Sequence, residues 1–287
     1  MKNTTENKKS IEFFALKLVI GFSLFNGCIS NEQYNFGKLE TKLFLGDGEK
    51  QPLVVAFGGS EGGNIYAQEE TKELRKKLLD NGFALLSIGY FGTSNTPTEI
   101  DRISLNAIYD TINKIANHPK IDGNRISLIG SSRGGELVLN LGSHFQNFDA
   151  VVAMVAPNVN LPSRFGWKAH SSWSYNDKQV PIINASKESV KKIKEGDFYH
   201  GMVAILEENK NNDIGKIEIE KISCPLLFIS AKQDEIWPSN FMAEQMIKRL
   251  KEKNFKHYYT HIELDGGHSA PVEHIDLMIE FLKENLN

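Results

Sequence analysis

The sequence predicts an α/β fold in which a mostly parallel central sheet carries helices on both faces. Short apolar runs alternate with helical periodicity from Leu53 onward, and this alternation is the first observation behind the prediction. The second is a G-x-S-x-G pentapeptide between a predicted strand and a predicted helix. The third is the length, because 287 residues suffice for one large α/β domain with a buried core but not for two full enzyme domains.

The composition is that of an ordinary globular protein. Hydrophobic residues make up 40% and charged residues 24%, which argues against a disordered chain and against a multispanning membrane protein. The formal net charge of −3 provides no basic surface for a phosphate backbone. Nucleic acid is therefore not an expected partner.

The N-terminus has the pattern of a targeting segment. Three lysines in the first nine residues precede the apolar stretch Ile11 to Phe25, which is too short and too interrupted for a spanning helix. The stretch runs into Asn26-Gly27-Cys28, which resembles the lipobox of bacterial lipoprotein signals, although Phe25 and Asn26 depart from that pattern. We expect a signal segment at residues 1–28, export, and membrane attachment through lipidated Cys28. A cytoplasmic protein with an apolar N-terminal helix is the alternative.

The α/β domain is expected at residues 29–287, and it begins with a strand at Lys38 to Leu45. The turn signal Gly46-Asp47-Gly48 is of the kind that joins antiparallel strands, so a short β-ribbon is expected at the entrance. Buried strands follow at Leu53 to Phe57 and Phe83 to Ile88, and the helix between them ends near Asn81-Gly82.

The same alternation continues through the rest of the domain. Ile108, Ile112 and Ile115 lie on one face of a helix predicted over Ile103 to Ala116. The remaining apolar runs predict strands at Arg125 to Ile129, Ala150 to Val155, Pro225 to Ser230 and Tyr258 to Leu264. Helical periodicity predicts helices at Glu136 to His144, Asn240 to Lys253 and Glu273 to Asn285.

The alternation fails between Pro157 and about Ile219. A loop of that length in a compact domain usually has a function, so a cap over the active site is expected at about 157–219. The aromatic side chains that would shape its pocket are Phe165, Trp167, Trp173, Tyr175, Phe198 and Tyr199.

The pentapeptide Gly130-Ser131-Ser132-Arg133-Gly134 predicts a nucleophile. A sharp turn between strand and helix needs glycine at both ends, and it presents the hydroxyl of Ser132 at the edge of the sheet. The turn also opens a helix, where the backbone amide of Arg133 can point at a developing oxyanion. The alternative is a glycine-rich turn without catalytic function.

A serine hydroxyl needs a base and an orienting carboxylate, and both follow in the expected order. Asp234 comes just after one predicted strand and His268 just after the next, so all three side chains reach one edge of the sheet. Glu235 and Asp265 are rival carboxylates, and each residue taken singly could be an ordinary surface group. Their joint order and placement favour a triad and an α/β-hydrolase fold with a cap insertion.

A glycine-rich loop, Gly58 to Gly63, follows the first buried strand. It lacks the Lys-Ser/Thr ending of a P-loop and does not match G-x-G-x-x-G. In a hydrolase such a loop supplies a second oxyanion amide, here from Gly59 or Ser60, although the glycines could serve only a tight turn.

A metal site is an alternative for five potential ligands that lie close in the sequence, His261, Glu263, Asp265, His268 and His274. There is no H-E-x-x-H and no cysteine set, and strand alternation would place neighbouring candidates on opposite faces. Neither a metal nor another cofactor is expected.

Most of the chain from the glycine loop onward resembles a known family, the C-terminal catalytic domain shared by acyl-CoA thioesterases and bile acid-CoA:amino acid N-acyltransferases. The matching pieces are Phe57 to Gly63, Ile88 to Gly92 before Pro97, Leu128 to Leu137, Gln233 to Ser239, and Gly267-His268. The resemblance implies that Ser132, Asp234 and His268 are nucleophile, acid and base. Members that transfer acyl groups to amino acids tend to carry cysteine as nucleophile, so Ser132 favours hydrolysis.

The expected activity is cleavage of a carboxylic ester or thioester through an acyl-serine intermediate, as the resemblance to acyl-CoA thioesterases implies. The family's thioesterases carry a β-sandwich ahead of this domain, which the residues before Leu53 are too few to form. An exported carboxylesterase on non-CoA esters is therefore a second interpretation. A non-catalytic binding protein is a third, and a complete triad argues against it.

Overall fold

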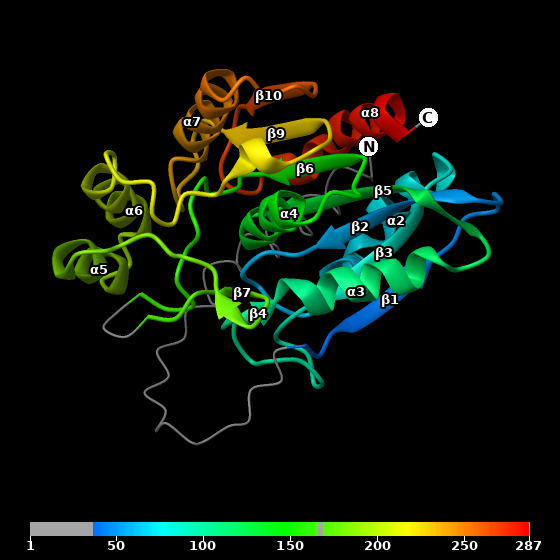
Figure 1. Ribbon diagram of the computed structural model, residues 1–287, viewed down its shortest axis with the longest axis horizontal. Helices are drawn as coiled ribbons and strands as arrows, with labels where there is room; N and C mark the ends of the chain where they lie inside the picture. The colour runs from blue at the N-terminus through cyan, green and yellow to red at the C-terminus, as the bar shows by residue number, and fades with distance from the viewer. Residues whose placement is uncertain (1–36, 166–168, 287) are drawn as a thin grey trace, which may run out of the picture.

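The protein is a three-layer α/β structure, seen in a computed structural model that describes residues 37–165 and 169–286 (Figure 1). The predicted signal segment with Cys28, and Trp167 of the predicted cap, lie outside the described residues. None of the helices in the described ranges is long and apolar enough to cross a membrane.

A seven-stranded sheet forms the middle layer. Its strand order is β1-β3-β2-β5-β6-β9-β10, and every neighbouring pair is parallel except β1 with β3. The strands are β1 (Glu40–Phe44), β2 (Gln51–Phe57), β3 (Ala84–Gly89), β5 (Ile121–Ser131), β6 (Ala150–Met154), β9 (Leu226–Ala231) and β10 (Tyr259–Leu264).

Helices cover both faces of this sheet because its central strands are apolar on both sides. In β2, Leu53, Val55 and Phe57 face one layer, while Val54 and Ala56 face the other. The first layer holds α3 (Leu105–Ala116), α4 (Arg133–His144) and α7 (Ser239–Glu252). The second holds α2 (Lys72–Asp80) and α8 (Ile275–Leu286). The predicted fold class is confirmed.

Two local predictions were wrong. No ribbon joins β1 to β2; instead β1 pairs antiparallel with β3, from Glu40 opposite Gly89 to Phe44 opposite Leu85. The half-exposed β1 suits the sheet edge, whereas the buried β2 lies between two parallel neighbours. The helix predicted from Ile103 begins at Leu105, because Ile103–Ser104 forms β4 instead.

The segment between β6 and β9, called the insertion here, contains more regular structure than its sequence indicated. Its elements are β7 (Trp173–Tyr175), β8 (Lys178–Gln179), α5 (Lys187–Lys194), α6 (Phe198–Glu208) and the 3₁₀ turn η3 (Ile219–Lys221). β4 and β8 flank β7 in a small second sheet. The helices α5 and α6 lie on the side towards which the parallel strands point, at the left of Figure 1. The described residues also form the 3₁₀ turns η1 (Ile65–Ala67), η2 (Glu69–Thr71) and η4 (Ala270–His274).

The insertion packs its own apolar cluster against the loop that follows β9. Ile193 of α5 and Met202 of α6 join Leu161, Trp237 of the loop and Met242 of α7. The insertion therefore lies beside the carboxyl ends of the strands, where open α/β sheets bind ligands.

Candidate active site

Ser132 lies in a strained turn between β5 and α4. Its φ of 57° and ψ of −121° fall outside the regions that a non-glycine residue ordinarily adopts, and its side chain is buried. The turn is held by a hydrogen bond of 2.9 Å from the amide of Ser132 to the carbonyl oxygen of Met154 in β6. Strain of this kind persists only where the surroundings enforce it, and it is concentrated at functional sites.

The neighbouring glycines are sterically required. A Cβ on Gly130 would lie 2.1 Å from the carbonyl oxygen of Gly134, and one on Gly134 would lie 2.5 Å from the carbonyl oxygens of Phe57 and Gly58. Both contacts are with backbone atoms, which cannot move aside as a flexible side chain can. The glycines thus let α4 approach β2 closely enough to form the turn at Ser132.

Asp234 and His268 form a buried pair. Both carboxylate oxygens of Asp234 lie 2.9 Å from Nδ1 of His268. Oδ1 of Asp234 also accepts the backbone amides of Ile236 at 3.0 Å and Trp237 at 3.2 Å. These bonds fix the carboxylate, and the carboxylate in turn fixes the tautomer of the imidazole with its proton on Nδ1.

The rival carboxylates have other partners. Glu235 accepts the backbone amide of His268 at 2.9 Å, so it holds the loop rather than the ring. Asp265 is exposed and pairs with Lys232 at 2.9 Å. Of the three carboxylates, only that of Asp234 contacts the imidazole.

Trp237 connects the histidine to the serine turn. Its ring lies edge-on to His268, with centroids 5.0 Å apart, and its Nε1 donates to the carbonyl oxygen of Val155 at 2.9 Å. Val155 directly follows Met154, the residue that holds the amide of Ser132. Nε2 of His268 is buried and makes no hydrogen bond to another described residue. Because Nδ1 faces the carboxylate, Nε2 is the nitrogen left to accept a proton. Catalytic hydrogen bonds are often long in the absence of substrate, so its lack of a partner does not argue against that role.

The glycine-rich loop lies against the serine. A Cβ on Gly59 would be 3.0 Å from Cβ of Ser132, so a side chain there would crowd the serine. The amide of Gly59 donates to Oε1 of Glu61 at 2.9 Å. Of the two loop amides predicted to bind the oxyanion, Gly59 and Ser60, that of Gly59 is therefore already engaged. Within the described ranges the amide of Ser60 has no such bond, and that of Arg133 opens α4 without an intrahelical acceptor.

Glu61 is a site residue that the sequence did not single out. Desolvation raises the pKa of this half-buried carboxyl. The backbone amides of Glu61 and Gly59, and the nearby His268, act in the opposite direction and lower it. A lone acidic residue inside a glycine-rich loop was the available signal. Tyr90 supports the same loop, because its hydroxyl donates to the carbonyl oxygen of Gly58 at 2.8 Å.

The residues considered for a metal do not gather in the part of the chain that the structure describes. No group of three histidine, cysteine, aspartate or glutamate side chains there could hold an ion. His261, for example, instead contacts the hydroxyl of Ser230 at 2.7 Å through Nε2.

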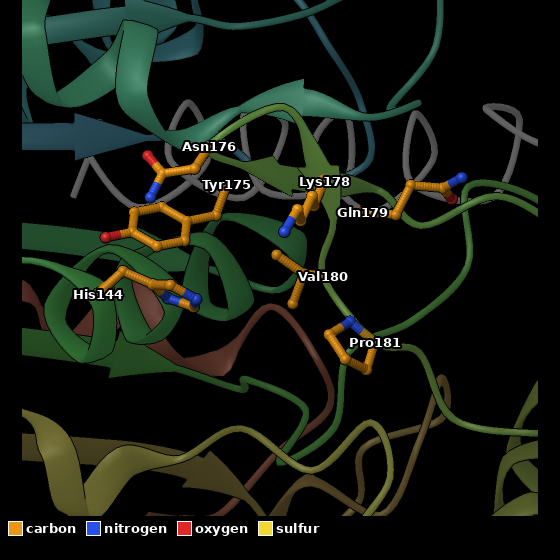
Figure 2. A pocket seen from close by; sticks show the side chains of 7 residues that line it. All are labelled: His144, Tyr175, Asn176, Lys178, Gln179, Val180 and Pro181. Atoms are coloured by element: carbon orange, nitrogen blue, oxygen red, sulfur yellow. The ribbon is translucent and has the colours of Figure 1, made fainter.

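A surface pocket of about 310 Å³ lies away from these residues, at the opposite end of α4 (Figure 2). Its lining residues are His144, Tyr175, Asn176, Lys178, Gln179, Val180 and Pro181. The two ends of a twelve-residue helix are about 18 Å apart, so this pocket does not adjoin Ser132.

The comparisons with solved structures show the fold. The acetyl xylan esterase from Paenibacillus sp. R4 is 15% identical, with a TM-score of 0.55 over 86% of this chain and 80% of that one. The monoacylglycerol lipase of Paleococcus ferrophilus is 20% identical, with a TM-score of 0.53 over 86% of this chain and 99% of that one.

Sequence relatives point to one family. Human acyl-coenzyme A thioesterase 6 is 28% identical over 228 residues, covering 78% of this chain and 50% of that protein. The mitochondrial acyl-coenzyme A thioesterase 2 of Mus musculus is 26% identical over 219 residues, covering 75% of this chain and 44% of that protein. The chain thus spans about half the length of the curated relatives that it matches. The model of the family described as "BAAT / Acyl-CoA thioester hydrolase C terminal" matches residues 103–272, more than half of the chain. The resemblance predicted from the motifs is confirmed, and the chain belongs to the BAAT / acyl-CoA thioester hydrolase C-terminal family.

Proposed function

We propose that this protein is a serine hydrolase that cleaves a carboxylic ester or thioester through an acyl-serine intermediate. The observation that carries the proposal is a strained serine, Ser132, at a strand-to-helix turn linked through Trp237 to the buried pair of Asp234 and His268. Family membership supports it, because the curated relatives are named acyl-coenzyme A thioesterases.

In the proposed first step, Nε2 of His268 takes the proton of the Ser132 hydroxyl while Oγ bonds to the substrate carbonyl carbon. The carbonyl oxygen becomes an oxyanion, which the amide of Arg133 stabilises at the positive end of α4. Collapse of the tetrahedral intermediate breaks the bond to the alcohol or thiol, which leaves with the proton held by His268. A water molecule then repeats the sequence and releases the acid.

The buried position of Asp234 suits its proposed role. During the reaction His268 carries a positive charge in a site from which water is largely excluded, where an opposite charge is worth more than at the surface. Asp234 supplies that charge and holds the ring through Nδ1, which leaves the second nitrogen to accept the proton of the serine.

The second oxyanion donor is proposed to be the amide of Ser60. Gly59 lies closest to the serine, but its amide already binds Glu61. Ser60 follows directly in the same loop, and its amide is not bonded to any other described residue.

Two substrate classes are candidates. Acyl-CoA thioesters are favoured by the family, and non-CoA esters by the signal-like segment at residues 1–28, since an exported enzyme would meet little acyl-CoA. Export with lipidation at Cys28 is part of the second candidate. Cells that express the protein should incorporate radioactive fatty acid into it, and labelling that persists in Cys28→Ser would refute the lipid anchor.

The deciding experiment compares hydrolysis of acyl-CoA thioesters and p-nitrophenyl esters by wild type and Ser132→Ala. We expect turnover of at least one class, reduced by at least about 10³-fold in the variant. Turnover unchanged in Ser132→Ala would remove Ser132 from its role. Turnover of neither class by the wild type would favour a non-catalytic binding protein.

A further inference from the structure

A fully buried carboxylate, that of Glu136, lies one helical turn after Ser132 in α4. Its Oε1 accepts the backbone amide of Leu161 at 2.9 Å and the indole nitrogen of Trp173 at 2.7 Å. Its Oε2 pairs with Nη1 of Arg133 at 2.7 Å. One carboxylate therefore joins the helix of the proposed nucleophile to two separate points of the insertion.

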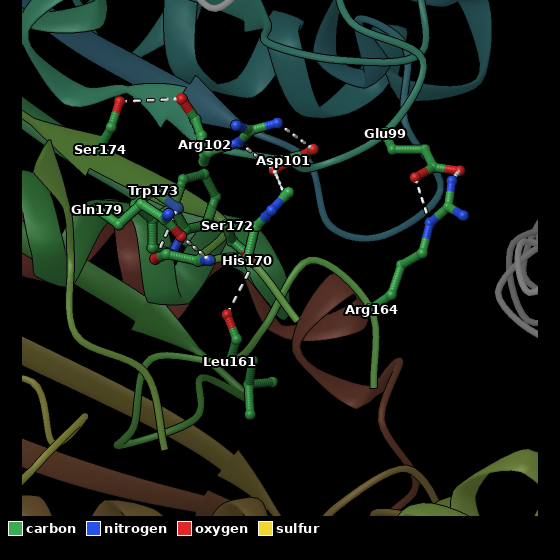
Figure 3. Close-up of polar contacts among 11 residues, drawn as sticks. Glu99, Asp101, Arg102, Leu161, Arg164, His170, Ser172, Trp173, Ser174 and Gln179 are labelled. Carbon is green, nitrogen blue, oxygen red and sulfur yellow. Dashed lines mark hydrogen bonds and ion pairs between the residues drawn. The ribbon is translucent and has the colours of Figure 1, made fainter. Parts of the chain in front are cut away.

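Arg133 extends the same connection. Its Nη2 donates to the hydroxyl of Ser172, and this hydroxyl donates to the carbonyl oxygen of Leu161 at 2.9 Å, a contact visible in Figure 3. Its guanidinium lies 5.8 Å from the centre of the Trp173 ring. Because the backbone amide of Arg133 is the proposed oxyanion donor, contacts that fix its side chain also fix the first turn of α4.

The glycine-rich loop is connected to Glu136 through Trp173. Its ring lies 5.8 Å from that of Tyr90, and the hydroxyl of Tyr90 holds the carbonyl oxygen of Gly58 in the glycine-rich loop. Both segments that carry the proposed oxyanion donors are thus connected to Glu136. Arg133 pairs with it directly, and the loop of Ser60 is connected through Tyr90 and Trp173.

The buried pair of Glu136 and Arg133 is not explained by a contribution to stability alone. Burial raises the pKa of Glu136 against the opposing effect of Arg133, so ionisation of the carboxyl carries a desolvation cost. A buried ion pair is often no more stabilising than apolar side chains of the same size. Its specific benefit is geometric, since it admits one arrangement of its partners.

We propose that Glu136 is a positioning residue, which sets the distance between the oxyanion-binding amides of Arg133 and the glycine-rich loop. This inference rests on the proposed function. Glu136 touches neither the substrate nor the reacting atoms in it, and acts through Arg133, Trp173 and Tyr90.

The insertion has a second attachment that does not use Glu136. The amides of Arg102 and Ile103 donate to the carbonyl oxygens of Ser171 and Ser172, at 2.9 Å and 2.8 Å. Figure 3 shows two ion pairs and a hydroxyl contact in the same region, Asp101 with Arg102, Glu99 with Arg164, and Ser174 with the carbonyl oxygen of Arg102. We therefore expect the insertion to stay in place when Glu136 is changed conservatively.

The test variant is Glu136→Gln, which keeps an oxygen for Leu161 and Trp173 but removes the charge that pairs with Arg133. We expect kcat per active site to fall by roughly tenfold to a hundredfold, with KM within about threefold of wild type, because small misplacements of catalytic groups have effects of this size. The inhibition constant of a boronic acid that mimics the tetrahedral intermediate should rise by the same factor as kcat falls. Burst titration with a p-nitrophenyl ester counts the active sites, so partial misfolding does not enter kcat.

The matched control is Glu220→Gln, which breaks the ion pair of Glu220 in η3 with Arg249 in α7, 2.6 Å apart. It should keep wild-type kcat and boronate affinity. If Glu136→Gln does not fold, the double variant Arg133→Met/Glu136→Leu takes its place. It removes both buried charges and keeps the backbone amide of residue 133, and we expect the same loss of kcat and of boronate affinity.

The outcomes separate this inference from the proposed function. Activity that survives in Ser132→Ala contradicts both. In an enzyme that Ser132→Ala inactivates, kcat and boronate affinity of Glu136→Gln within twofold of wild type contradict this inference alone. An equal loss of kcat in Glu220→Gln would also contradict it.

Discussion

Replacing Asp234 by asparagine should abolish most of the activity by reversing the tautomer of His268. Oδ1 of Asp234 accepts two backbone amides, from Ile236 and Trp237, so the oxygen of an asparagine must occupy that position. Its NH₂ group then takes the place of Oδ2, 2.9 Å from Nδ1 of His268. Oδ1 also lies 2.9 Å from Nδ1, but it already accepts the two backbone amides. We therefore expect the NH₂ group to donate to Nδ1 and the imidazole proton to move to Nε2.

A protonated Nε2 cannot take the proton of the Ser132 hydroxyl. Loss of the correct tautomer in an aspartate-to-asparagine variant of a serine protease costs about 10⁴-fold in kcat, which corresponds to about 5 kcal/mol of transition-state stabilisation. We expect a loss of that order in Asp234→Asn, with little change in KM or thermal stability. The assay is kcat per titrated active site on a p-nitrophenyl ester.

The control for this prediction is Glu235→Gln, whose side-chain oxygen can still accept the amide of His268. It should keep kcat within about tenfold of wild type. If Asp234→Asn keeps more than a tenth of wild-type kcat, or if Glu235→Gln loses as much as Asp234→Asn, the assignment of the orienting carboxylate is wrong.

Three further predictions concern stability. Gly130→Ala should lower the free energy of unfolding, measured in urea, by about 3 kcal/mol or more, because its Cβ would lie 2.1 Å from a backbone oxygen. The control Gly48→Ala should be nearly neutral, because its Cβ would meet only the side chain of Gln51, at 3.4 Å. Trp237→Phe should cost about 1–3 kcal/mol in the same assay, since the buried carbonyl of Val155 loses its donor, and a cost below about 0.5 kcal/mol would contradict this. The raised pKa of Glu61 means that its ionisation costs stability as the pH rises from its ordinary value of 4.5 through the raised one. Glu61→Gln should therefore have a higher Tm than wild type at pH 7, with the difference closing below pH 4, and a difference that grows on acidification would refute the sign.

The sharp turn at Ser132 and the pair of Asp234 with His268 could be predicted because they depend on local rules. A glycine-bounded serine after an apolar strand forces a sharp turn, and the loops after parallel strands meet at one sheet edge, so Ser132, Asp234 and His268 could be grouped without coordinates. Two of them, Asp234 and His268, are in direct contact in the structure.

What the sequence did not reveal depends on pairings between distant residues. The choice between Asp234, Glu235 and Asp265 follows from which carboxylate faces the ring, and all three lie in loops of similar composition. The contact of Glu61 with the amide of Gly59 depends on how the glycine loop folds back on itself.

The strand errors have the same origin. Turn residues predicted a hairpin after β1, but the apolar partners available to β2 on both sides outweigh local turn chemistry. Helix α5 was missed because its two apolar residues stand among five charged ones. Helix α6 was missed because it is apolar along most of its length and contains a glycine, so it shows no clear polar face.

The most direct test of the account is covalent trapping of the nucleophile. The wild-type protein should be treated with a fluorophosphonate, digested, and mapped by mass spectrometry, with Asp234→Asn and His268→Ala as controls. We expect one stoichiometric adduct on Ser132, strongly reduced in both variants. An adduct on another residue, or undiminished labelling of Ser132 when His268 is replaced, would contradict the proposal that His268 activates Ser132 for acyl transfer.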